Sequence, residues 1–171
     1  MPRRILRYPD PRLREVAEPI TKIDDYVREL AQEMIGLMKK KDGCGLAGPQ
    51  VGEALRIFVI DTSEEQNDPK IFINPEIDWT KGEFQSLEGC LSFPGCRCRL
   101  KRATELGYWC QDLDGSEREE KAAGKEAIAI QHELDHLDGL LFIDRVDAVD
   151  RQKLKGYLKR LEKVPLEKDL P

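Results

Sequence analysis

Apolar residues recur at intervals of three and four in three stretches of the chain, and this spacing predicts three helices. The first covers 25–39 and ends at three lysines followed by Gly43, which is a typical helix stop. The second covers about 124–138 and the third about 147–163. The apolar stripe of the third helix consists of Leu154, Tyr157, Leu158 and Leu161.

The middle of the chain has the shorter period of β-strands. The runs 56–61 and 71–77 are rich in β-branched and aromatic residues. Apolar and polar residues then alternate from Gly95 to Arg118, with a turn predicted at Asp114–Gly115. The apolar positions of this region are Cys96, Cys98, Leu100, Leu106, Tyr108 and Cys110. A helix followed by antiparallel strands and then further helices indicates the α+β class.

Length and composition narrow the class of protein. The 171 residues predict one domain over 1–171, and 40% hydrophobic with 36% charged residues is typical of a folded, water-soluble chain. No apolar run approaches the roughly 20 residues of a membrane-spanning helix. The first residues lack the apolar core of a signal peptide, so we expect a cytoplasmic protein. A net charge of −5 argues against non-specific nucleic-acid binding by the body of the protein.

Both histidines of the chain lie in the sequence His132-Glu133-Leu134-Asp135-His136. Residues four apart on a helix share one face, so the two imidazoles can bind one metal ion. Glu133 lies to the side of that face, where it can accept a proton from a water molecule that the ion acidifies. The spacing therefore predicts a catalytic metal site rather than two unrelated histidines.

The third ligand must be a cysteine or a carboxylate, because no histidine remains. Five cysteines do not suggest a secreted disulfide framework, and no C-x-x-C pair suggests a structural zinc site. Cys96, Cys98 and Cys110 fit buried apolar positions. Cys90 is favoured, since Gly89 before it permits a close backbone approach and Pro94 is expected to close a turn after it. Glu162 and Glu167 are the carboxylates that a zinc peptidase would use instead.

A glycine-rich loop over 43–52 contains the pattern G-x-G-x-x-G of dinucleotide-binding proteins. That pattern needs a strand before it and a helix opening within it, whereas here a predicted helix comes before it and Pro49 interrupts it. We therefore expect no dinucleotide. Gln50 is the notable polar residue of the loop, because its amide could donate to an oxyanion.

Three segments together resemble the peptide deformylase family, whose motifs have the forms GxGxAAxQ, EGCLS and HExDH. They are Gly43–Gln50, Glu88–Ser92 and His132–His136, in the family's order. Gly48 replaces the second alanine of the first motif, which we expect to loosen the loop slightly. Cys44 stands where a branched aliphatic residue is common in the family.

The resemblance implies removal of the formyl group from the initiator methionine of nascent proteins, with release of formate. Its metal ligands would be Cys90, His132 and His136, around one Fe²⁺ ion that Zn²⁺, Ni²⁺ or Co²⁺ can replace. Glu133 would be the catalytic acid and base, and Gln50 with the backbone N–H of Leu91 would form the oxyanion hole. The remaining implied residues bind substrate: Gly45 and Gly89 through the backbone, and Ile128 and Ala129 as the floor of the methionine pocket. We expect an α+β fold in which antiparallel β-sheets pack around a central metal-binding helix, with further helices near the N-terminus and the C-terminus. We also expect the protein to be a monomer.

Two charge patterns lead to further expectations. Glu88 and Asp135 adjoin predicted ligands and would be costly if buried alone, so each needs a partner, and Arg102 is the candidate for Glu88. The terminal segment 151–171 begins with six basic residues and one acidic residue over 151–163. This helix could dock on ribosomal RNA or simply cover the core. Apart from a deformylase, the alternatives are the zinc peptidase named above and a non-catalytic metal-binding or ribosome-associated module.

Overall fold

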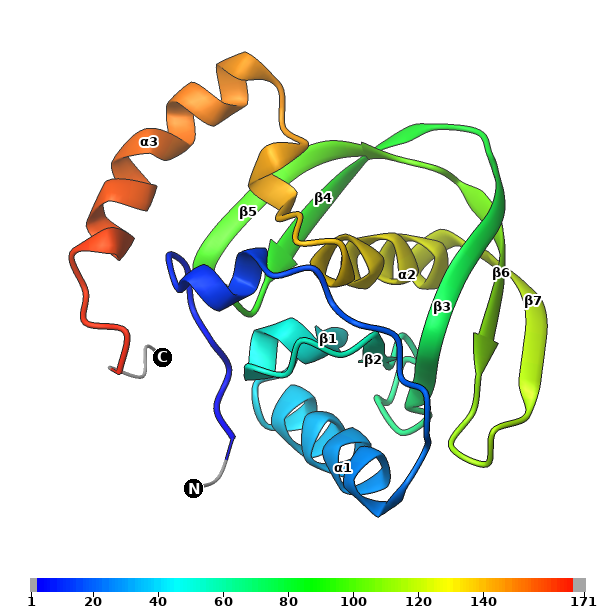
Figure 1. Ribbon diagram of the computed structural model, residues 1–171. Helices are drawn as coiled ribbons and strands as arrows, with labels where there is room; N and C mark the ends of the chain where they lie inside the picture. The colour runs from blue at the N-terminus through cyan, green and yellow to red at the C-terminus, as the bar shows by residue number, and fades with distance from the viewer. Residues whose placement is uncertain (1–2, 168–171) are drawn as a thin grey trace.

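A computed structural model describes residues 3–167, which form two antiparallel β-sheets and three α-helices (Figure 1). The larger sheet has the strand order β1-β2-β3-β6-β7, and β4 pairs with β5 in the smaller one. The strands of the larger sheet are β1 (Gly45–Ala47), β2 (Ile57–Ile60), β3 (Lys70–Lys81), β6 (Glu105–Gln111) and β7 (Glu117–Ala123). Those of the smaller sheet are β4 (Phe84–Cys90) and β5 (Phe93–Arg102).

The three predicted helices are confirmed as α1 (Asp25–Lys40), α2 (Gly124–Leu137) and α3 (Ala148–Glu162). Aspartates cap two of them: Asp24 accepts a hydrogen bond from the backbone of Val27, and Asp147 accepts one from Asp150. Short 3₁₀ helices cover Pro11–Arg14, Gly48–Val51 and Phe142–Asp144.

Helix α2 lies between the two sheets, and α1 covers the opposite face of the larger sheet (Figure 1). The side chains of β2 explain this arrangement, because successive residues of a strand point to opposite faces. Phe58 and Ile60 pack in the cluster that includes α2, whereas Ile57 and Val59 pack against α1. Both faces of β2 are therefore buried, which accounts for its unbroken apolar sequence.

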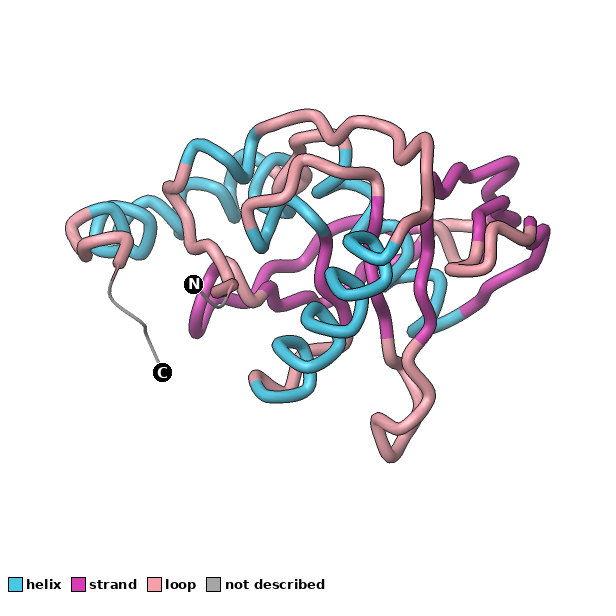
Figure 2. The backbone as a smooth tube through the Cα atoms, turned by 60° about the horizontal axis from the view of Figure 1, so that its bottom comes forward, coloured by secondary structure: helices cyan, strands magenta, loops and turns pink. Residues whose placement is uncertain are grey.

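A second apolar cluster joins β5 to α3 and to the 3₁₀ helix Phe142–Asp144. Figures 1 and 2 show α3 at one end of the molecule. Its C-terminal end is held by Arg7, which is 6% exposed and donates hydrogen bonds to the carbonyls of Leu161, Val164 and Pro165. The predicted stripe of α3 faces the cluster, with Leu161 buried and the other three members half-buried.

The strands differ from the sequence prediction in three places. β3 continues to Lys81, beyond the predicted end at 77, because its polar second half pairs with β6. Residues 84–90 form strand β4, which no alternation predicted. Pro94 lies within β5 rather than closing a turn, and the turn after Cys90 consists of Leu91 and Ser92. The Asp114–Gly115 turn is confirmed, with Gly115 in the left-handed conformation at φ 84°.

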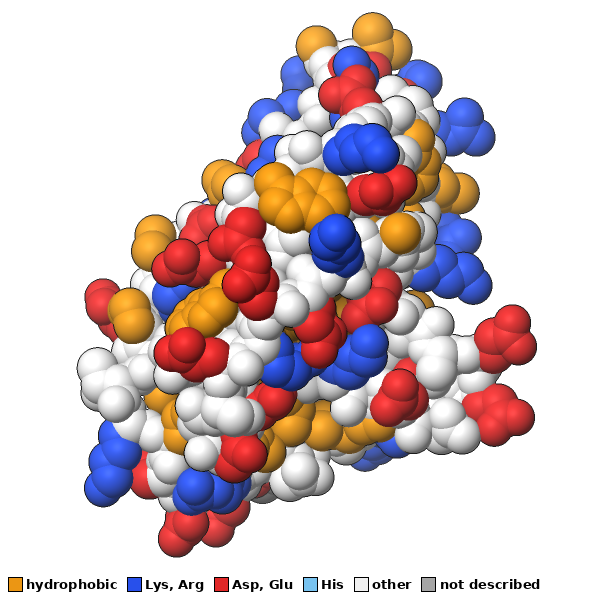
Figure 3. Space-filling model, turned by 90° about the vertical axis from the view of Figure 1, so that its right-hand side faces the viewer, with side chains coloured by type: hydrophobic (Ala, Val, Ile, Leu, Met, Phe, Trp, Pro, Cys, Tyr) orange, Lys and Arg blue, Asp and Glu red, His pale blue; other side chains and the backbone are white. Residues whose placement is uncertain are grey.

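Within residues 3–167, no helix combines the length and the apolar character that crossing a membrane requires. The face that bears β3, β6 and β7 carries acidic and basic side chains interspersed (Figure 3). That face has no continuous basic area.

Candidate metal centre and active site

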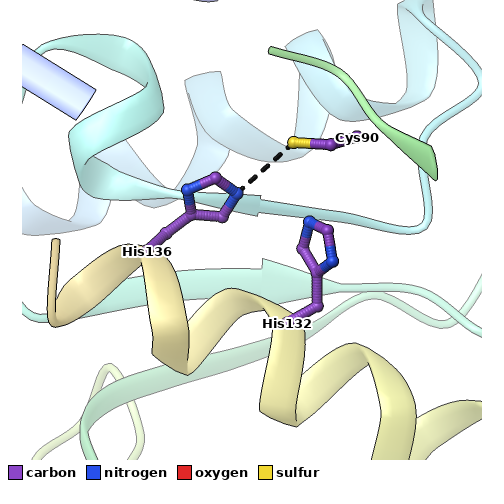
Figure 4. A group of neighbouring side chains, drawn as sticks. All are labelled: Cys90, His132 and His136. Carbon is purple, nitrogen blue, oxygen red and sulfur yellow. Dashed lines mark hydrogen bonds between the residues drawn. The ribbon is translucent and has the colours of Figure 1, made fainter. Parts of the chain in front are cut away.

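Helix α2 and the end of strand β4 bring the three predicted metal ligands together. The ligand atoms of Cys90, His132 and His136 all lie within 4.8 Å of one another. The Sγ of Cys90 is 3.4 Å from Nε2 of His136, and the three side chains point toward one another (Figure 4). Both histidines are buried, with 8% and 1% of their surfaces exposed.

The donor set fits a divalent transition-metal ion. Three protein ligands with one position left open is the arrangement of catalytic sites, and a thiolate with two imidazoles suits several such ions. Burial lowers the pKa of His136 well below its usual value, which keeps this imidazole neutral and able to bind metal. Of the carboxylates considered for a peptidase, Glu162 is exposed and accepts a hydrogen bond from Tyr8, and Glu167 is exposed. Neither belongs to the cluster.

Glu88 orients His132. Nδ1 of His132 is 2.9 Å from Oε1 of Glu88, and a carboxylate can only accept, so Nδ1 carries the proton and Nε2 is left for the metal. Arg102 donates to both oxygens of Glu88 at 2.9 Å, which confirms the predicted partner. Burial opposes ionisation of Glu88, but the hydrogen bonds from His132 and Arg102 outweigh it and lower the pKa of Glu88 to about 2.

Asp135 has two basic partners. The sequence analysis predicted that it needs a partner but did not say which residue. Arg102 donates to it at 2.8 Å, and Arg145 donates to both of its oxygens at 2.6 Å. Arg102 therefore bridges two buried carboxylates beside the metal site. Arg145 follows α2 by only eight residues, but nothing in its sequence surroundings indicated this contact.

Glu133 is 4% exposed and lies against the backbone of Gly45. A Cβ atom added at Gly45 would be 2.3 Å from Oε1 of Glu133, so only glycine leaves room for the carboxylate. Its Oε2 is buried and has no hydrogen-bond partner within the described chain. Burial raises the pKa of Glu133 to about 7, in the range where a carboxylate can both accept and return a proton.

Gln50 lies in the 3₁₀ helix Gly48–Val51, where its side chain is fixed at both ends. Its Oε1 accepts from the backbone N–H of Ala47 at 2.9 Å, which directs Nε2 toward the site. Nε2 lies 3.1 Å from Oγ of Ser92 and 3.6 Å from Sγ of Cys90. Ser92 is fully buried and completes this contact, a role that we did not predict.

The glycine-rich loop forms β1 and then a 3₁₀ helix, so no α-helix begins where a pyrophosphate would bind. The expected loosening at Gly48 is wrong. Gly48 is buried, and a Cβ there would lie 2.7 Å from the carbonyl oxygens of Glu53 and Leu55. The loop is closely packed at this residue.

One cavity of about 1250 Å³ unites the predicted site. Its lining includes every predicted site residue except His136, which contacts Cys90 just behind it. Ile128 is half-buried and open to the cavity, whereas Ala129 is 9% exposed and also belongs to the core. Gly45 lies on the edge strand β1, and Gly89 lies on β4. Cys96 and Lys125 line the cavity as well.

The family model of polypeptide deformylase matches residues 2–152. Among curated relatives, the peptide deformylase of Dictyoglomus thermophilum is 48% identical over 145 residues, which cover 85% of this chain and 93% of the relative. That of Alkalilimnicola ehrlichii is 43% identical over 158 residues, which cover 92% and 89%.

Solved structures of peptide deformylases are also similar to this chain. A peptide deformylase from Legionella pneumophila superposes with a TM-score of 0.89 at 34% identity, covering 99% of this chain and all of the other. The Thermotoga maritima enzyme gives 0.82 at 40% identity, covering 86% and 99%. This chain belongs to the polypeptide deformylase family, and it is a hydrolase that removes the N-formyl group from nascent peptides.

Proposed function

We propose that Cys90, His132 and His136 hold one Fe²⁺ ion, which Zn²⁺, Ni²⁺ or Co²⁺ can replace, and that the deformylation takes place beside it. The convergence of one thiol and two imidazoles, of which Cys90 and His132 line the cavity, is the observation that carries this proposal. Such an ion lowers the pKa of a water molecule and polarises the formyl oxygen.

Glu133 is the general base and acid. Its free Oε2 accepts the proton of the attacking water, and the same carboxyl later donates that proton to the departing amine. Gln50 Nε2 and the backbone N–H of Leu91 donate to the oxygen of the formyl group as negative charge develops on it. Because the backbone of Ala47 already fixes Oε1 of Gln50, this donor is oriented before the substrate binds.

The peptide substrate lies between two strands that border the cavity. Gly45 on β1 and Gly89 on β4 offer backbone groups to an extended peptide, as in other cases of strand addition. The methionine side chain packs on Ile128 and Ala129, one helical turn before His132. Residues 1–171 act as one domain in this proposal, since α2 packs against the larger sheet and is hydrogen-bonded to the smaller one through Glu88 and Arg102.

The decisive experiment measures formate release from formyl-Met-Ala-Ser together with the metal content of the same sample. Protein purified without oxygen should contain iron and have the highest activity, because both Fe²⁺ and a thiolate ligand are oxidised in air. Fully active protein that contains zinc alone would contradict the choice of iron.

Two variants separate metal binding from proton transfer. Glu133→Gln should retain the metal and lose at least about 100-fold in kcat, as expected for a general acid–base residue. Cys90→Ser should lose metal and activity together. A Cys90→Ala protein that keeps both would favour the peptidase arrangement, and full activity in Glu133→Gln would overturn the mechanism.

We further propose that the enzyme acts as a cytoplasmic monomer and docks on the ribosome through α3. Arg151, Lys155, Lys159 and Lys163 are spaced four apart and exposed, so they form one basic stripe opposite the apolar face. Among the charges of residues 3–167, no acidic side chain pairs with these four. The stripe supports binding to the phosphate backbone of RNA.

Ribosome binding should be tested without truncation, because deleting α3 would uncover the cluster around Leu161. Lys155→Gln with Lys159→Gln should abolish co-sedimentation with ribosomes, and wild-type binding should fall steeply with added salt. Lys101→Gln with Lys121→Gln, two exposed lysines on β5 and β7, is the matched control. Equal loss in both double variants would show that overall charge, not α3, carries the binding.

A further inference from the structure

Two cysteines outside the metal cluster lie together on strand β5. Cys96 and Cys98 are two residues apart on the same face, and their Sγ atoms are 3.8 Å apart. They are 6% and 4% exposed and pack among Phe93, Leu100 and Phe142. Within residues 3–167, each thiol has the other as its only hydrogen-bonding partner.

The separation of the two sulfur atoms suits a single atom bound between them. Two sulfur atoms bound to one three-coordinate, pyramidal centre by bonds of about 2.3 Å are roughly 3.5 Å apart, so a small shift of the present pair admits such an atom. A disulfide fits less well, because it needs an S–S distance of about 2.05 Å and Cβ atoms about 3.8 Å apart. Alternate residues of one extended strand lie about 6.6 Å apart, so closing a disulfide would require the strand to bend.

One member of the pair is reached from the cavity of the active site. Cys96 lines that cavity together with Cys90 and Gly95. Burial raises the pKa of Cys96 and raises that of Cys98 to about 12, so both thiols are protonated near neutral pH and poor nucleophiles toward alkylating reagents. A ligand suited to this pair must therefore take up both sulfurs at once and carry away both protons.

We propose that Cys96 and Cys98 form a dithiol site for a thiophilic metalloid, of which a trivalent arsenical is the chemical class that fits. In the reaction with an arsine oxide, two S–H bonds and the As–O bond break and two As–S bonds form. The two protons leave with the oxygen as water, and arsenic remains trivalent. The metal cluster cannot replace this site, because it offers only one thiol, that of Cys90.

The test incubates the metal-loaded protein with phenylarsine oxide and follows the adduct by intact-mass spectrometry and the melting temperature by calorimetry. We expect one adduct per chain and a higher melting temperature, since a ligand that binds only the folded state stabilises it. Cys96→Ala and Cys98→Ala should each lose the adduct and the temperature shift. Cys110→Ala, which removes a single buried thiol on β6, should keep both.

Several outcomes would overturn the proposal. These are no adduct on the wild type, an adduct that survives in either alanine variant, or an adduct that lowers the melting temperature because the thiols react only after unfolding. Loss of the adduct in Cys90→Ser would show that Cys90 takes part and the pair is not the site. If either alanine variant fails to fold, Cys96→Ser and Cys98→Ser provide the same comparison.

Discussion

Gly45 contacts the carboxylate of Glu133 so closely that the smallest side chain would displace it. The first and third motifs are more than 80 residues apart in the chain, yet they meet at this contact. The carboxylate of Glu133 can occupy its position only because residue 45 is glycine. The sequence predicted both residues as part of the site. It could not predict that they touch, because that contact depends on how β1 packs against α2.

Gly45→Ala should therefore lower activity through Glu133. A Cβ at 2.3 Å from Oε1 moves the carboxylate, and a misplaced acid–base group should cost about 100-fold in kcat. Metal content should stay at the wild-type level, because the three atoms nearest to the added Cβ all belong to Glu133 and none to a metal ligand. Steady-state kinetics with metal analysis checks this, and Gly36→Ala on α1 is the matched control, since a Cβ there meets nothing within 4 Å. Unchanged kcat in Gly45→Ala would refute the packing argument.

Arg102 illustrates a residue-scale prediction that the structure extended. A buried carboxylate needs a partner, and this predicted the pairing of Arg102 with Glu88. The same guanidinium also donates to Asp135, and Arg145 shares this second carboxylate. The first pairing rested on a rule about buried charge. The other contacts depend on where the chain turns after α2, which local sequence does not determine.

Arg102→Ala should destabilise the protein by about 3 kcal/mol, because it leaves two carboxylates buried without this partner. For a chain of this length, that corresponds to a melting temperature lower by about 6–12 °C. Metal affinity should also fall, by about 10–100-fold, since Glu88 orients His132. Arg145→Ala should cost only about 1 kcal/mol, because Arg145 is 44% exposed and Asp135 keeps Arg102. Unchanged metal content and melting temperature in Arg102→Ala would exclude the orienting role.

At the scale of the elements, the observed helices match the predicted ones closely, whereas the strands match less well. The boundaries of α1, α2 and α3 lie within about two residues of the predicted ones, because apolar spacing is a local signal, to which α1 and α3 add an aspartate cap. Strand β4 escaped prediction because Phe84–Cys90 has little β-branched content and forms by pairing with β5. This strand ends at Cys90. The ligand was therefore identified from the motif Glu88–Ser92, and not from a predicted strand.

The 3₁₀ helix Pro11–Arg14 leads to a prediction about acid stability. Asp10 caps it, is 4% exposed, and accepts hydrogen bonds from the backbone and the guanidinium of Arg12. The hydrogen bond from the Arg12 side chain lowers the pKa of Asp10 below its usual value. A carboxyl whose pKa is lower in the folded state stabilises the protein above its unfolded pKa of about 3.9, and that contribution is lost as the pH falls toward the folded value.

Asp10→Asn keeps a capping oxygen and removes the charge, so it isolates this effect. At pH 7 the variant should be less stable than the wild type by about 1 kcal/mol, and the difference should shrink as the pH falls below about 4. Urea unfolding at several pH values measures it. Asp25→Asn is the control, since Asp25 is 96% exposed and should change stability little at any pH. A difference independent of pH would mean that the charge of Asp10 is not the cause.

At the scale of the whole molecule, the three metal ligands come from β4 and α2, two elements that pack in different apolar clusters. Cys90 comes from β4 and packs against the cluster around β5 and α3, whereas α2 supplies both histidines and packs against the larger sheet. A bound ion would therefore cross-link the two sheets through α2. The motifs predicted the three ligands. That the ion would connect the two sheets could be seen only once the strands had been assigned to their sheets.

Removing the ion should lower the stability of the entire fold. A metal that binds only the folded chain contributes about 2.7 kcal/mol when its free concentration is 100 times its dissociation constant, so chelation should lower the melting temperature by about 5–11 °C. Hydrogen exchange should increase at the end of β4 and in the last turns of α2, which carry the ligands, and not in α1, which packs on the far face of the larger sheet. Cys90→Ser should melt at the same temperature with and without chelator, whereas Cys110→Ser should keep the difference. An equal response to chelator in both variants would place the stabilising ion somewhere other than between β4 and α2.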